Sequence, residues 1–308
     1  MTEVSSHVVG DDSESESKSL ERTLAKLEAR VAERHPKTFP KRAQINPTTT
    51  GKVVQLPIWP EFRRGVPNEL VRGALFTIGN TRTPRAYRRS MVIASLSNIE
   101  INYTGEELRQ DDEDVFLQLV HLARVSPLGS EVSFTAHSML KSLKWPTNSR
   151  SYDRLRETIM RLQASGVEIR TARGGYSGSL IRDFEWREDG SGTSSRSWNV
   201  RLEPRIASLF DNVSYTQIDW DQRLRLGTLA KWLHAFYYTH QKPFPMKTGT
   251  IRTLCGSTTK DLSKFRQLLK ASLSELISVG FLRSAEIQSG SDLVFVIRTN
   301  DADKLVSK

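Results

Sequence analysis

Hydrophobic and polar positions follow the same order twice along this chain. In the first series, apolar residues at helical spacing predict three helices, at 114–125, 136–143 and 151–165. A short strand is expected at 131–135, between the first two helices. Alternating apolar residues then predict further strands separated by Gly and Ser turns, at 167–172, 179–186 and 197–203.

The second half of the chain repeats this order. Helices are expected at 226–240, 250–255 and 260–279, with a strand at 244–247 and a hairpin formed by 281–288 and 293–299. Gly166 and Gly280 follow the long third helix of each series, where glycine adopts a left-handed conformation at the least cost. The chain therefore contains a weak internal repeat, in which the same module occurs twice.

Helix, strand, helix, turn, helix and hairpin are the elements of a winged-helix domain, whose third helix enters the DNA major groove. We therefore predict an α+β fold with two winged-helix domains in tandem, at 101–210 and 211–300. Residues 1–50 are expected to form a partly disordered arm that holds one amphipathic helix at 20–31. Residues 51–100 are expected to be a basic extended linker and the start of the folded body, and 301–308 a tail.

Each third helix has an apolar stripe and an opposite polar face. The stripes are Tyr152, Leu155, Ile159 and Leu162 in the first helix and Leu262, Phe265, Leu269, Leu273 and Leu276 in the second. Opposite them lie Arg150, Arg154 and Arg161, and then Lys260, Lys264 and Gln267. Any surface helix shows basic residues opposite such a stripe, but two in corresponding positions favour contacts with DNA phosphates and base edges.

The predicted wings add a weaker set of cations. Arg170 and Arg173 flank the glycine-rich turn at 174–178, and we include both in the predicted DNA-binding set. The alternative is that this stretch is only a flexible turn between strands.

The charge distribution favours a polyanionic partner. The net charge is +10, and residues 36–89 alone hold a net +9, whereas residues 1–35 hold a net −3. The basic segment is either a solvated linker that its charges keep extended or an arm that contacts phosphates.

Several function classes are disfavoured by what the sequence lacks. It has one cysteine and no apolar run of about 18 residues, so we expect no disulfide and no membrane span. Its start has no apolar secretion core, which indicates a cytoplasmic protein.

Catalytic motifs are missing as well. We find no phosphate-binding loop, no dinucleotide fingerprint and no alternate histidine pair. Asp111, Asp112, Glu113 and Asp114 form an acidic cluster that suits either a divalent metal or, more favourably, the positive N-terminal end of a helix. We therefore expect no enzyme activity, no metal and no cofactor.

The residues resemble a known family, the iteron-binding plasmid replication initiators of the TrfA type. The likeness runs from about Leu56 to Thr299, and the matching stretches, in order, are WPEFRRGVPNELVRGALFTIGN, INYTGEELRQDDED, SPLGSEVSFT, LKWPTNSRSYDRLRETIMRLQASG and HQKPFPMKTGTIRTLCGS. This resemblance implies a protein with two winged-helix domains that binds direct repeats at a plasmid origin and opens the neighbouring duplex. It also implies recruitment of the host replicative helicase and polymerase, monomer–dimer self-association and a part in plasmid copy control.

Members of that family also carry a peptide for the host β sliding clamp. Gln55, Leu56, Ile58 and Trp59 resemble it, with apolar anchors on an extended segment that suit insertion into a groove. Pro57 and the Trp in place of Phe depart from the usual pattern. The alternative is that Trp59 packs on the body of the protein.

The predicted function is therefore plasmid replication initiation on double-stranded origin DNA. A transcriptional repressor that uses the same modules on its own promoter is the alternative, and it predicts an inverted-repeat site. A metal-dependent nickase is a third and less favoured interpretation.

Overall fold

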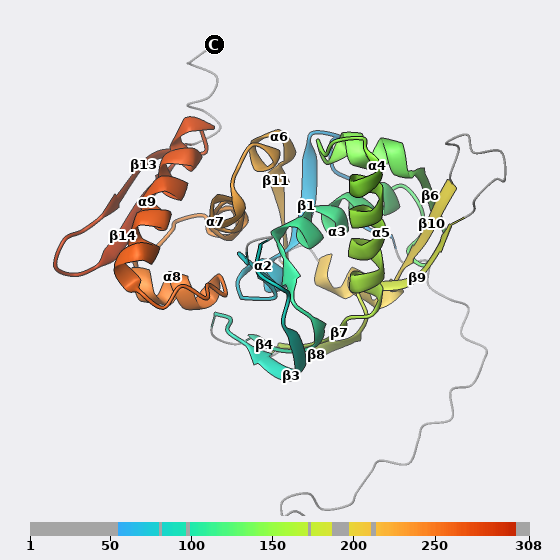
Figure 1. Cartoon of the computed structure of the whole chain (residues 1–308), viewed down its shortest axis with the longest axis horizontal. Helices are drawn as coiled ribbons and strands as arrows, with labels where there is room; N and C mark the ends of the chain where they lie inside the picture. The colour runs from blue at the N-terminus through green and yellow to red at the C-terminus, as the bar shows by residue number, and fades with distance from the viewer. Residues whose placement is uncertain are drawn as a thin grey trace, which may run out of the picture. The chain divides into compact units, whose positions relative to one another are not determined.

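The computed structural model describes residues 55–79, 82–96, 99–171, 174–186, 197–210 and 214–299, all within one compact unit that spans residues 53–308 (Figure 1). These ranges hold both helices and sheets, which confirms the mixed α and β class that the sequence predicts. The predicted N-terminal arm at 1–50, with its helix, and the tail at 301–308 lie outside the described residues.

The segment before the first predicted module is folded. Its elements are β1 (Arg63–Pro67), α2 (Asn68–Val71), β2 (Phe76–Thr77), β3 (Tyr87–Ile93), β4 (Ile99–Glu106) and β5 (Leu108–Arg109). The side chains of Val66, Leu70 and Phe76 are buried in the core. The prediction of an extended basic linker is therefore wrong for this stretch, because its apolar residues contribute to the body.

The first module contains the three predicted helices, α3 (Gln110–Ala123), α4 (Ala136–Ser142) and α5 (Ser149–Gln163). Polar side chains begin two of them, since the Thr135 hydroxyl accepts from the backbone of Ser138 and Asn148 accepts from that of Ser151. The strands are β6 (Val132–Thr135), β7 (Gly166–Thr171), β8 (Gly174–Gly178), β9 (Ile181–Trp186) and β10 (Ser197–Leu202), followed by the 3-10 helix η1 (Pro204–Phe210).

The strands after α5 are divided between two sheets. β10 lies between β6 and β9, whereas β7 and β8 join the earlier strands in the order β3-β4-β7-β8. Antiparallel pairing of β4 with β7 places Ile101 opposite Ile169, and both are buried. Because Gly166 begins β7 and does not have a positive φ, the prediction that it ends α5 in a left-handed conformation is wrong.

The second module contains α7 (Thr228–Tyr238), α8 (Thr248–Leu254) and α9 (Leu262–Ser278), as the repeat predicts. β11 (Tyr215–Asp219) and α6 (Trp220–Leu224) precede them, and β11 pairs with β1. A three-stranded sheet has the order β12-β14-β13, from β12 (Met246–Lys247), β13 (Leu282–Ile287) and β14 (Leu293–Arg298). Gly280, with φ of 73°, has the predicted left-handed conformation.

Four helices pack in the spatial order α5, α3, α7, α9 (Figure 1). The predicted apolar stripes face inward, as Leu155 and Ile159 of α5 and Phe265 and Leu269 of α9 are fully buried. α5 and α9 therefore lie on the two outer sides of the α3–α7 pair. Within the described ranges, no helix combines the length and the apolar content that a membrane crossing needs.

The acidic cluster at the start of α3 is buried and paired with cations. We call Asp111, Asp112, Glu113 and Asp114 the α3 carboxylate cluster. Asp112 accepts from the backbone N–H of Arg109 and pairs with Arg85 at 2.5 Å and Arg161 at 2.7 Å. Burial, and then the charge of Asp111, raise the pKa of Asp112 to about 6, so this carboxyl is still ionised at neutral pH.

The other end of the cluster joins the first module to the second. Asp114 pairs with the fully buried Arg223 of α6 at 2.7 Å and with Lys231 of α7. Arg223 also lies 3.4 Å from Glu113, and Gln110 donates to Glu113 at 2.8 Å. The cluster lies at the start of α3, in agreement with its interpretation as the charged start of a helix. In addition, its carboxylates form ion pairs with cations from four other segments.

Asp114→Asn is expected to lower the free energy of unfolding by about 3 to 5 kcal/mol, because it leaves Lys231 without its carboxylate partner and the fully buried Arg223 with Glu113 alone. Asp221→Asn is the matched control, since Asp221 pairs with Lys144 at the surface and its loss should cost less than about 1 kcal/mol. Urea unfolding at neutral pH measures both. Equal losses in the two variants would contradict the role assigned to the cluster.

Candidate nucleic-acid interface

The exposed face of α9 carries the polar residues that the sequence predicts. Asp261 caps the helix by accepting from the backbone N–H groups of Ser263 and Lys264. The side chains of Lys260, Lys264 and Gln267 are exposed, with the apolar stripe turned to the core behind them. This surface therefore presents two ammonium groups and one amide to solvent.

The start of α5 presents a similar surface. Arg150 is exposed in the first turn of the helix. The guanidinium of Arg154 lies 3.9 Å from the ring centroid of Trp145 and 2.9 Å from a carboxylate oxygen of Asp111. The Arg154 side chain is 42% exposed to solvent. Arg154 is thus held in place between a ring and a carboxylate while its outer edge remains accessible.

Arg161 departs from the prediction that it contacts DNA. Its side chain is only 10% exposed, and it pairs with Asp112 at 2.7 Å and Glu106 at 3.1 Å. Two carboxylates fix this guanidinium in place, and its low exposure leaves little of it within reach of a partner. Arg161 therefore connects α5 to the α3 carboxylate cluster, and we remove it from the predicted interface.

The predicted wing cations are only partly described. Arg170 lies on β7, where it is exposed and pairs with the neighbouring Glu168 at 2.7 Å. Arg173 lies outside the described residues. In the second module Arg298 packs against the rings of Tyr238 and Phe281, and it donates to the carbonyl of His240. The role of Arg170 in DNA binding stays a prediction.

The clamp-like peptide is not available as a free segment. Leu56 and Trp59 are each only 2% exposed, and the indole N–H of Trp59 donates to Nδ1 of His121 at 3.0 Å. Gln55 donates to the carbonyl of Arg124, and only Ile58 is exposed, at 73%. The prediction that these residues insert into a partner's groove is therefore wrong, because two of the three apolar anchors are part of the protein's own core.

The sequence also predicts a core position for His234 and no metal site. His234 is buried against the rings of Tyr238 and Phe281, in agreement with the predicted core role. Among the residues that the structure describes, no three His, Cys, Asp or Glu side chains are grouped so that they could hold a metal ion.

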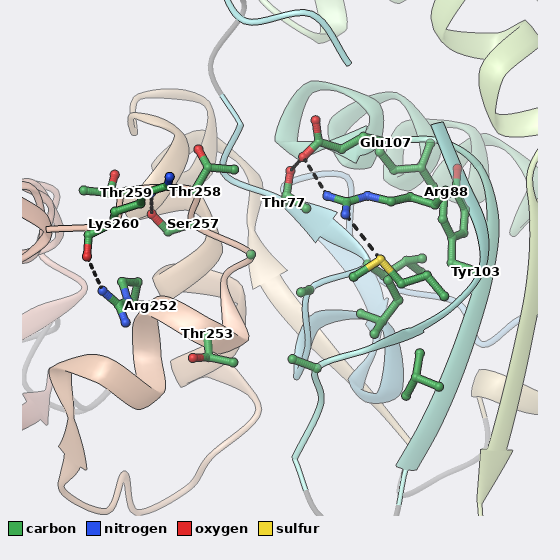
Figure 2. A pocket seen from close by; sticks show the side chains of 18 residues that line it. Thr77, Arg88, Tyr103, Glu107, Arg252, Thr253, Ser257, Thr258, Thr259 and Lys260 are labelled. Carbon is green, nitrogen blue, oxygen red and sulfur yellow. Dashed lines mark hydrogen bonds and ion pairs between the residues drawn. The ribbon is translucent and has the colours of Figure 1, made fainter. Parts of the chain in front are cut away.

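The sequence analysis missed a pocket that borders the turn before α9. It has a volume of about 610 Å³ and lies between β3, β4 and the α8–α9 turn, which we define as residues 255–261. Figure 2 shows Arg88 and Glu107 on one side of it and Arg252 and Lys260 on the other. The only signal in the sequence was one basic residue in α8 and a polar turn, and nothing local connects these to β3.

The sequence of the chain matches a known protein family. The family model described as "TrfA protein" matches residues 25–298, which is most of the chain. The chain belongs to the TrfA family. This match confirms the resemblance that the sequence indicates. It begins at residue 25, whereas the resemblance begins at about Leu56.

A curated TrfA relative and two solved structures are similar to the chain. It is 32% identical over 240 residues to the "Plasmid replication initiator protein TrfA" of Escherichia coli, a match that covers 77% of the chain and 62% of that protein. The chain thus matches less than two thirds of this TrfA relative. The crystal structure of RctB domains 2-3 has a TM-score of 0.51 at 11% identity and covers 78% of the chain and 100% of the RctB chain.

The second structure is that of selenomethionine derivatives of RctB domains 2 and 3. Its TM-score is 0.53 at 11% identity, and it covers 75% of the chain and 98% of the RctB chain. At this identity the likeness concerns the fold alone. The TrfA-family chain and the two RctB domains therefore share an arrangement of elements across both modules.

The burial of His121 makes the free energy of unfolding dependent on pH. Burial lowers the pKa of His121 from its usual 6.5 to about 4, and its neutral ring accepts from Trp59 and faces Glu61. Below pH 6.5 the unfolded chain binds a proton that the folded chain does not, so stability falls as the pH drops toward 4, by about 3 kcal/mol in total.

His121→Gln tests this dependence because its amide does not titrate. Urea unfolding of both proteins between pH 7 and pH 4 should show that the variant lacks this part of the decline. Glu61 also changes between the two proteins, because its hydrogen bond with His121 is the main cause that lowers its pKa. The same pair is therefore compared in a Glu61→Gln background, where the difference isolates His121. The same pH slope in both proteins would show that His121 is protonated in the folded state.

Proposed function

We propose that this protein is a plasmid replication initiator that binds direct repeats of origin DNA through two winged-helix modules in tandem. The observation that carries the proposal is the exposed polar face of α9, formed by Lys260, Lys264 and Gln267. Membership of the TrfA family supports it, as does the printed function of the Escherichia coli relative. The repeated order of helix, strand, two helices and strands supports the winged-helix assignment.

The two third helices make the main contacts in this proposal. α5 contributes Arg150 and Arg154, and α9 contributes its three polar residues, each set entering a major groove. Because α5 and α9 lie on opposite sides of the α3–α7 pair, one molecule spans about two turns of the duplex. The exposed Arg170 adds a contact to the phosphate backbone.

Initiation requires steps after DNA binding. We propose that several bound molecules together supply the several kcal/mol needed to bend and unwind a neighbouring A·T-rich segment. The protein acts in the cytoplasm by binding rather than by catalysis, and it associates with itself and with the host replicative helicase. Direct repeats beside the gene would favour this function over a repressor, which would use an inverted repeat.

Substitutions on α5 and α9 test the interface. Lys264→Ala and Arg150→Ala should weaken binding to all DNA sequences and reduce the slope of log affinity against log salt by about one unit each. Gln267→Ala should cost about 1 to 3 kcal/mol on the repeat and relax sequence preference. Fluorescence anisotropy at several salt concentrations, with repeat and scrambled duplexes, measures both effects.

Arg161→Ala is the matched control for Arg150→Ala, because both residues lie on α5. It should lower stability through its lost pairs with Asp112 and Glu106, while the salt slope of DNA binding stays unchanged. Unchanged affinity, selectivity and salt slope in the Lys264 and Gln267 variants would remove α9 from the interface.

Duplex opening is expected without a nucleotide. Permanganate reactivity of thymines next to the repeats should increase when the protein saturates a supercoiled origin in the absence of ATP. A linear fragment of the same origin is the control, because it lacks the supercoiling energy that helps to open the strands. Unreactive thymines at saturation would assign melting to another factor.

A further inference from the structure

The pocket beside the α8–α9 turn has a lining that the proposed function does not use. One wall is apolar and comes from β3, where Met91 is 41% exposed and lies on the same sheet face as the buried Ile93. Leu75 and Leu108, both buried, also form part of its lining. Apolar side chains left open to water in a concave site gain free energy when a flat apolar group covers them.

The opposite wall is polar and positively charged. Arg252 uses one guanidinium N–H to donate to the carbonyl of Lys260 at 2.9 Å. Neither Arg252 nor the Lys260 ammonium has a carboxylate within ion-pair distance among the residues that the structure describes. Hydroxyl groups continue this wall, from Thr253, Ser257, Thr258 and Thr259 (Figure 2). The wall therefore carries two positive charges without an internal counter-charge.

The carboxylate that lines the pocket does not balance them. Glu107 pairs with Arg109 at 2.8 Å and accepts from the hydroxyl of Thr77 at 2.9 Å. Arg88 lies 3.8 Å from Glu107 and extends into the pocket between the two walls (Figure 2). An anion that enters the pocket consequently meets more positive than negative charge.

The two walls are held at a fixed spacing. Gly256, with φ of 64°, approaches Thr77 so closely that an added Cβ would lie 2.7 Å from the Thr77 methyl group. The backbone N–H of Ile78 donates to the carbonyl of Cys255 at 3.1 Å. A site with both walls already in place loses little entropy when a ligand binds.

We propose that this pocket binds a nucleoside monophosphate. Its phosphate contacts Arg252, Lys260 and the hydroxyl groups, while its base covers Met91. Two uncompensated cations match one phosphate dianion, and the volume falls within the range of small-ligand sites.

Isothermal titration of the full chain with deoxyadenosine 5′-monophosphate, in the absence of DNA, tests the proposal. Deoxyadenosine and inorganic phosphate are each expected to bind at least about tenfold more weakly, because each engages one wall only. Arg252→Ala and Met91→Asp are each expected to weaken nucleotide binding about tenfold. Lys270→Ala, exposed on α9 outside the pocket, is the control and leaves its affinity unchanged.

Thermal unfolding and origin-DNA binding of the same preparations separate this proposal from the proposed function. Nucleotide binding that is absent, or unchanged in the Arg252 and Met91 variants while both remain folded, overturns the pocket assignment and leaves DNA binding intact. A single-stranded oligonucleotide that binds in an Arg252-dependent way while the free nucleotide does not would also overturn it.

Discussion

The burial of three consecutive carboxylates at the start of α3, beside a fourth that is partly buried, is the constraint on which the rest of the structure depends. Carboxylates near a helix N-terminus are favoured by the helix dipole, but taking them out of water is costly unless each finds a cation. Here the cations come from separate segments, namely Arg85 before β3, Arg161 of α5, Arg223 of α6 and Lys231 of α7. The ion pairs therefore hold four segments against one helix.

This constraint determines which surfaces remain for a partner. α3 packs on α5 and α7 packs on α9, so α3 and α7 occupy the middle and the other two helices the outer sides. The inner faces of α5 and α9 are buried by their apolar stripes. Arg161 of α5 pairs with Asp112 of the α3 carboxylate cluster and is therefore not on the exposed face of the helix. The exposed polar residues include Arg150 at the beginning of α5 and Lys264 at the beginning of α9. In winged-helix proteins this part of the third helix is directed toward DNA.

The positive charge of the chain is used in two ways. In the segment with the largest surplus, Arg64 is buried against the Trp220 ring and Gln118, and Arg72 donates to Thr239. Arg85 serves the carboxylate cluster. A basic composition thus overstates the charge that reaches a polyanion, because guanidinium groups also satisfy the protein's own carbonyls and carboxylates. In the part of the chain that the structure describes, Lys260, Lys264 and Lys270 are exposed cations of α9 and its preceding turn.

The sequence by itself determined the helices, their apolar stripes, their repeated order and the family, because helical periodicity and motif order are local properties of the chain. Only the tertiary structure decided which cations are available, since Arg161 pairs 49 residues away and Lys231 pairs 117 residues away. The same limit applies to Leu56 and Trp59, whose apolar pattern suits a partner's groove as well as the protein's own core. β7 and β8 also lie in a different sheet from β9 and β10, because β7 pairs with β4, a strand more than 60 residues earlier in the chain. Pairings at such separations are set by which surfaces meet in space, and no spacing along the chain records them.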